Sequence, residues 1–267
     1  MDVPTAALLV AGGAVAGFFA GAFAIGDGLV MVPVLLLALQ GWHVSSLVAT
    51  QVAMGTSLAA TAAASVALAW RAKGRDQVLR RETAVLALAG AAAAVTGAAI
   101  AAALEGTALR RIFGFVLLVA AVRLMGGRRK SGKSTDEPAP VLKLIPVGFI
   151  TGLVSSLTGS GAGVVSVPLL YSYLRIPLRK STGTAHAVAV VCALAGAVAY
   201  IAWGWSSEFL PDGMHGFIDW PSAVALALGA VAGALAGERM GERADKPAVR
   251  YTYAVALLFV MIRMSFV

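Results

Sequence analysis

Apolar residues fill this chain in long runs, separated by short polar stretches and by two glycine clusters, Gly26-Asp27-Gly28 and Gly159-Ser160-Gly161-Ala162-Gly163. A membrane-spanning α-helix needs about 20 predominantly apolar residues, and most of the runs approach or exceed that length. The helical segments expected are 5–25, 29–40, 44–70, 82–104, 107–125, 142–158, 164–174, 178–204, 221–238 and 247–266. The pattern therefore predicts an all-α polytopic membrane protein embedded in a lipid bilayer.

Composition supports this class. The chain is 59% hydrophobic and 13% charged, whereas soluble domains carry about 25% charged residues. The formal charge of +8 is attributed to basic cytoplasmic loops, so nucleic-acid binding is not expected. The single cysteine, Cys192, excludes an intrachain disulfide and is interpreted as a small apolar residue; whether it meets a substrate is left open.

The two halves of the chain repeat one pattern of glycine and proline at a distance of 135 residues. The matching sets are Gly13, Gly17, Gly26, Gly28 and Pro33, and Gly148, Gly152, Gly161, Gly163 and Pro168. This duplication predicts a transmembrane repeat over 1–126, a cytoplasmic basic linker over 127–140 and a second transmembrane repeat over 141–267. Glycine-interrupted segments at matching places in two halves indicate the binding site of a transporter.

Each run after a glycine break is about 12 residues long and rises only about 18 Å as a helix, which is too short to span. The broken segments either cross once or fold back as hairpins. With hairpins and both termini outside, all but three of the 21 basic residues, Arg110, Arg111 and Arg263, fall inside, as the positive-inside rule requires. Each repeat is then one hairpin plus three transmembrane helices, and the repeats are inverted in the cytoplasmic membrane.

Inversion brings the two breaks together near the midplane. Short helices that begin there present N-terminal amides, which favour anions. The alternative is that the glycines only permit close helix packing, and this is the interpretation preferred for Gly13 with Gly17 and for Gly148 with Gly152. At the breaks themselves a binding role is favoured, because each break precedes a proline in a stretch too short to cross.

The glycine turn followed by an apolar run ending in Val-Pro, at Gly26–Pro33 and at Gly161–Pro168, resembles the TauE/SafE family of sulfite exporters and 4-toluene sulfonate uptake permease-type transporters. Gly55-Thr56-Ser57 and Ser181-Thr182-Gly183-Thr184 support the resemblance, which covers the whole chain. It implies transport of a small sulfur-containing anion, usually by export. Asp27 and Ala162 stand where the family typically has a third glycine, so the substrate and the coupling ion stay open.

Asp27 and His186 are the titratable candidates inside the membrane, where ionisable residues are costly and are read as functional by default. A protonated Asp27 could donate a hydrogen bond to an anion, and losing the proton would help to expel it. The alternative, which is compatible, is that Asp27 caps the following helix. Proton coupling is therefore assigned to Asp27 and His186.

The predicted substrate contacts are the glycines of the breaks together with nearby polar side chains. Serine and threonine in membrane helices often bond to their own backbone instead, which is the competing interpretation for each hydroxyl. The predicted set is Gly26, Asp27, Gly28, Thr56, Ser57, Thr158, Ser160, Gly161, Gly163, Thr184 and His186.

One motif is rejected. Gly127 to Ser134 matches the phosphate-binding P-loop letter for letter, but that loop requires a preceding strand and a following helix, and here a transmembrane helix precedes it while prolines follow. No nucleotide, cofactor, metal site or catalytic residue is predicted. The sequence leaves open a carrier for another anion or a metal ion, a channel, and a membrane enzyme. The favoured function is a secondary sulfur-anion transporter that works by rocking one repeat against the other.

Overall fold

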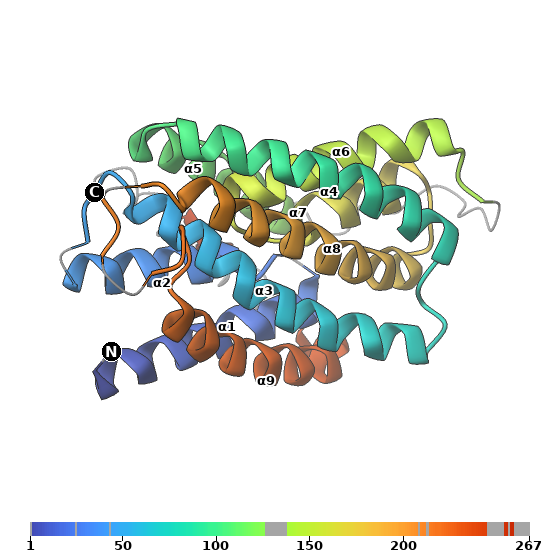
Figure 1. Cartoon of the computed structure of the whole chain (residues 1–267). Helices are drawn as coiled ribbons and strands as arrows, with labels where there is room; N and C mark the ends of the chain where they lie inside the picture. The colour runs from blue at the N-terminus through green and yellow to red at the C-terminus, as the bar shows by residue number, and fades with distance from the viewer. Residues whose placement is uncertain are drawn as a thin grey trace.

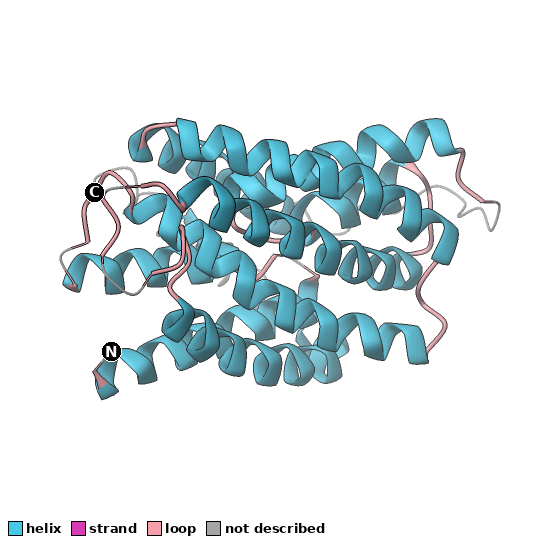
Figure 2. Ribbon diagram, in the orientation of Figure 1, coloured by secondary structure: helices cyan, strands magenta, loops and turns pink. Residues whose placement is uncertain are grey.

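The computed structural model describes residues 2–24, 26–42, 44–125, 138–207, 209–211, 214–244, 254–255 and 257–258. Over these residues the chain is a bundle of helices without strands (Figures 1 and 2). The helices are α1 (Val3–Phe23), α2 (Gly28–Gly41), α3 (Ala49–Gly74), α4 (Arg80–Ala103), α5 (Gly106–Met125), α6 (Val141–Thr158), α7 (Gly163–Pro168), η1 (Leu169–Tyr173), α8 (Leu178–Gly204) and α9 (Trp220–Ala244).

These bounds confirm nearly all of the predicted segments to within a few residues. In the described part of the chain, six helices are long and apolar enough to cross a membrane, namely α1, α3, α4, α6, α8 and α9. The segment 164–174 is divided, because the α-helix of α7 gives way to a π-helix, η1, after Pro168. The segment 247–266 is described only at 254–255 and 257–258, which are helical. The P-loop-like stretch and most of the linker lie outside the described residues.

Both broken segments fold back on themselves. In the first, a methyl group added at Gly12 of α1 would lie 2.9 Å from Val34 of α2, so the two arms run side by side in opposite directions. In the second, η1 leads into α8, and the start of α8 lies beside the start of α4. Helices α4 and α6 begin at the same end of the bundle, so the second broken segment returns to the end at which it started. Figure 2 shows loop segments inside the bundle, away from its two ends.

The hairpin arm α1 packs on a helix of the other repeat, α9. A side chain at Gly13 or Gly17 would overlap the backbone carbonyl of Leu226 or Ala230, respectively. Because the residue numbers rise together on both helices, α1 and α9 are parallel. Glycine removes the Cβ and lets the two backbones touch, which is the usual device for helix association in membranes.

The equivalent arm of the second repeat, α6, packs in the same way on α4 of the first. Gly148 faces the Leu86 carbonyl and Gly152 faces Gly90, so α4 and α6 are also parallel. The glycines at positions 13, 17, 148 and 152 are therefore packing residues, as predicted. The first arm of each hairpin, α1 or α6, therefore has its close partner in the opposite repeat. We call the two resulting groups of helices packing units: one holds α1, α2, α3 and α9, the other holds α4, α6, α7 and α8, and each unit crosses the sequence repeats.

Helices α3 and α8 lie in the centre and are antiparallel, because Gly55 faces Tyr200 while Gly183 faces Gln77. Helices α3 and α9 are parallel, because Thr56 contacts Asp219 at one end and Arg71 contacts Glu238 at the other. With the pairings above, helices α1, α3 and α9 run one way and α4, α6 and α8 run the other. The corresponding helices of the two repeats thus point in opposite directions. This is the arrangement that an inverted relation requires.

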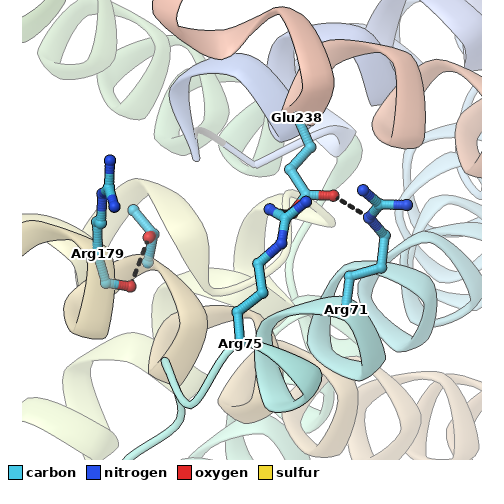
Figure 3. Close-up of polar contacts among 5 residues, drawn as sticks. Arg71, Arg75, Arg179 and Glu238 are labelled. Atoms are coloured by element: carbon cyan, nitrogen blue, oxygen red, sulfur yellow. Dashed lines mark hydrogen bonds and ion pairs between the residues drawn. The ribbon is translucent and has the colours of Figure 1, made fainter.

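Basic residues gather at the end of the bundle that holds the α3–α4 turn, which we call the basic end. At this end Glu238 of α9 accepts hydrogen bonds from Nε of Arg71 and, over 2.6 Å, from Nη1 of Arg75 (Figure 3). The pair joins α3 to α9 inside one packing unit. The basic residues at this end include Arg71, Lys73, Arg75, Arg80, Arg81, Lys143, Arg175, Arg179, Lys180 and Arg239.

Candidate functional site

The two glycine breaks meet in the middle of the bundle. A side chain at Gly26 would overlap the Ser160 carbonyl oxygen, and one at Gly28 would overlap the Gly159 carbonyl oxygen. From the other direction, a methyl group at Gly163 would lie 2.8 Å from the Ala24 carbonyl oxygen. Predicted site residues from both halves of the chain are therefore in backbone contact, although 135 residues separate the repeats.

The second break needs glycine for its backbone conformation as well as for space. Gly159 ends α6 with φ +61° and Gly161 has φ +71°, a left-handed conformation that disfavours side chains. A methyl group at Gly161 would also lie 2.7 Å from Cγ2 of Thr61 and 3.6 Å from Oδ1 of Asp27. Gly161 is therefore the point where the second break touches the acidic residue of the first.

Asp27 is 3% exposed and caps α2. Its Oδ1 accepts from the Gly28 amide over 3.0 Å and from the Thr61 hydroxyl over 2.6 Å. The capping interpretation is thus confirmed. The expectation of unpaired amides at this helix start is wrong, because the amides of Leu29 and Val30 also have carbonyl partners in the turn. The positive end of α2 is occupied by the carboxylate of the protein itself.

Three of the predicted hydroxyls lie at the second break. Ser57 of α3 donates to the Gly159 carbonyl over 2.9 Å. Thr158 donates to the Val154 carbonyl over 2.7 Å and lies 2.5 Å from the Ser160 hydroxyl. Ser57, Thr158 and Ser160 are all fully buried. Together with Asp27 they form a small polar core where the breaks meet.

Three other predicted residues are not brought to the breaks. Thr56 accepts from the amide of Asp219 at the start of α9, over 3.0 Å. Thr184 accepts from the amide of Leu79, the residue that precedes α4, over 3.1 Å. His186 follows two residues after Thr184 on α8, so it lies toward the basic end. Thr56 and Thr184 each join two chain segments in this structure.

Thr61 is a site residue that the sequence prediction missed. It is 1% exposed and supplies the side-chain hydrogen bond to Asp27. Its spacing of four from Ser57 places both hydroxyls on the same face of α3, which is a signal that the sequence contained. No group of histidine, cysteine, aspartate or glutamate residues in the described part of the chain could hold a metal ion.

The comparisons with known proteins all point to membrane transporters, and each match extends over most of the chain. The family profile described as "Sulfite exporter TauE/SafE" matches residues 9–264. A probable membrane transporter protein of Haemophilus influenzae is 26% identical over 214 residues, covering 80% of this chain and 80% of its own. A probable membrane transporter protein of Xylella fastidiosa is 24% identical and covers 81% of this chain and 84% of its own. A further probable membrane transporter protein, from Methanocaldococcus jannaschii, is 23% identical and covers 73% of this chain and 72% of its own. No solved structure matches the chain.

Proposed function

Because the chain belongs to the sulfite exporter TauE/SafE family of membrane transporters, we propose that it exports a small sulfur-containing anion, such as sulfite or an organosulfonate, across the cytoplasmic membrane as a secondary transporter. The observation that carries this proposal is the contact between the two glycine breaks in the middle of the bundle. Non-helical backbone at membrane depth is tolerated only where it is buried or lines a cavity, and in carriers such broken helices hold the substrate.

The polar core at the breaks supplies the chemistry for an anion. The hydroxyls of Ser57, Thr158 and Ser160 are neutral donors. Ser57 donates to the Gly159 carbonyl, Thr158 donates to the Val154 carbonyl of its own helix, and the Ser160 hydroxyl lies 2.5 Å from that of Thr158. An anion with several oxygen atoms can replace those acceptors and take the hydrogen bonds. Recognition by neutral groups holds the anion without the strong ion pair that would prevent its release.

Asp27 supplies the coupling. Its carboxylate occupies the positive end of α2, which is the place that an incoming anion would otherwise take. When Asp27 is ionised, the anion is repelled; when Asp27 is protonated, the charge is removed and its O–H becomes a donor. Loss of the proton then drives the anion away from the breaks, so each transport cycle moves a proton as well as an anion. His186, toward the basic end, is the second proton carrier of the proposal.

Alternating access follows from the packing units. One unit is α1, α2, α3 and α9, and the other is α4, α6, α7 and α8; the glycine contacts of α1 on α9 and of α4 on α6 hold each unit together. The units meet along α3 and α8 and at the breaks. Rocking of these units would open the breaks to one end of the bundle at a time. The basic end is assigned to the cytoplasm by the positive-inside rule, which places both termini outside. The opposite directions of corresponding helices support inverted repeats.

The test is binding of sulfite, taurine, isethionate, sulfoacetate and sulfate to the purified protein, measured by thermal shift. In the Gly161→Leu variant, the leucine side chain would occupy the space beside Thr61 and Asp27. This variant should therefore lose the stabilisation by anions. Gly41→Leu is the matched control, because nothing lies within 4 Å of a methyl group at Gly41. Stabilisation by none of these anions in the wild type would overturn the sulfur-anion assignment.

Coupling is tested separately in proteoliposomes that contain the anion found by thermal shift. An imposed pH gradient should accelerate anion flux through the wild type but not through Asp27→Asn, which keeps the size of the side chain and cannot ionise. Flux through Asp27→Asn that still responds to the gradient would exclude Asp27 as the coupling residue, while leaving the substrate assignment intact.

A further inference from the structure

Helix α6 carries buried hydroxyls without hydrogen-bond partners. Oγ1 of Thr151 and Oγ of Ser155 have no partner in the structure, and the two residues are 0% and 1% exposed. Hydroxyls inside membrane helices commonly bond to a carbonyl of the preceding turn, as Thr158 does on the same helix and Thr96 does on α4. An unsatisfied buried hydroxyl is destabilising. What sets Thr151 and Ser155 apart is their place on the face of α6 that carries Thr158, because the described part of the chain has further unpartnered buried hydroxyls at Thr83, Ser156 and Ser222.

The two hydroxyls extend the polar core along one face of α6. Thr151, Ser155 and Thr158 are spaced by four and three residues, which puts them on the same side of the helix. Thr158 is part of the core at the break, and Thr151 lies about 10 Å further toward the basic end at a rise of 1.5 Å per residue. A track of hydroxyls thus leads from the break into the half of the bundle that ends in basic residues.

The first repeat lacks this track. The positions that correspond to Thr151 and Ser155, 135 residues earlier, are Ala16 and Ala20, which are buried in the same kind of hairpin arm. Close packing of the arm on its partner helix is therefore achieved with alanine and has no need of a hydroxyl. The difference between the arms indicates that the hydroxyls on α6 serve something other than packing.

We propose that Thr151 and Ser155 form a transit site, where an oxyanion travelling between the basic end and the breaks is held by the two hydroxyls. This inference rests on the proposed function and extends it to residues outside the breaks. Each hydroxyl donates one hydrogen bond to a different oxygen of the anion, which suits a sulfonate or sulfite with several acceptor atoms. Because the donors are neutral, the anion is passed on to the breaks without a strong ion pair.

The experiment measures anion flux and melting temperature for Thr151→Val with Ser155→Ala, which removes both hydroxyls while keeping the side-chain volume nearly constant. Transport should fall by about tenfold, which corresponds to the loss of two modest hydrogen bonds. The melting temperature should be unchanged or higher, because an unsatisfied buried group has been removed. Thr151→Ser with Ser155→Thr, which keeps both hydroxyls, should restore most of the flux.

Thr96→Val is the matched control, because the Thr96 hydroxyl is paired within its own helix, and its flux should equal that of the wild type. Unchanged flux in the double variant would overturn the transit site while the proposed function stands. A fall in flux that is matched by a lower melting temperature would also overturn it, since the hydroxyls would then be structural. A wild-type protein that moves no sulfur anion would overturn the proposed function and the transit site together.

Discussion

The hydroxyl of Thr61 donates a hydrogen bond of 2.6 Å to Oδ1 of Asp27. This bond fixes the acidic residue of the first break against the middle of α3 and next to Gly161 of the second break. Since Asp27 is 3% exposed, few other groups can compensate for the loss of this donor. The relationship links a residue that the sequence singled out to one that it did not.

Replacing Thr61 with valine should therefore lower both stability and transport. A hydrogen bond to a charged group contributes about 1.5–3 kcal/mol, and the cost should appear as a lower melting temperature in detergent. Anion flux should fall as well, because Asp27 loses the contact that positions it. Thr61→Ser retains the donor and should resemble the wild type; a serine variant as impaired as the valine variant would show that the methyl group matters rather than the hydroxyl.

Gly26→Ala should destabilise the protein by about 3 kcal/mol, the upper part of the range for overpacking. Its added methyl group would overlap the Ser160 carbonyl oxygen, which belongs to backbone and cannot move away cheaply. Gly41→Ala adds the same group where nothing lies within 4 Å and should leave stability nearly unchanged. Melting temperatures of the two variants, measured side by side, decide the matter, and equal values would mean that the breaks are not in contact.

Single-cysteine labelling should distinguish the two ends of the bundle. In a Cys192→Ala background, Ser206→Cys at the α8–α9 end and Lys73→Cys at the basic end provide two exposed positions. A membrane-impermeant maleimide should label Ser206→Cys in intact cells and Lys73→Cys only after permeabilisation. The reverse result would place both termini in the cytoplasm and invert the assigned direction of every helix.

Glu238→Gln should destabilise the protein by about 3 kcal/mol, because the Arg71 and Glu238 side chains are only 23% and 17% exposed and removing one partner of a largely buried ion pair leaves the other charge uncompensated. Unfolding measured for Glu238→Gln, Arg71→Met and the double variant gives the coupling energy between the two side chains. A coupling energy near zero would contradict this expectation and show that the pair does not hold α3 to α9.

Some features of the site were predictable because they depend on neighbouring residues. The cap at Asp27 follows from an acidic residue directly before a helix, and the breaks follow from glycines inside apolar runs. The partners of Thr56 and Thr184 were not predictable, since each hydroxyl contacts a backbone amide more than 100 residues away. The same holds for Thr61, whose contact with Asp27 depends on how the first hairpin lies against α3.

The sequence by itself determined the helices, the duplication and the two breaks, because these depend on local hydropathy and on glycine spacing. Only the tertiary structure decided that α1 packs on α9 and α4 on α6, so that the packing units cross the repeats. In a membrane, apolar helix faces gain little from hydrophobic burial against one another, and the choice of partner depends on how closely two backbones fit. That fit is a property of two surfaces together, and neither helix reveals it alone.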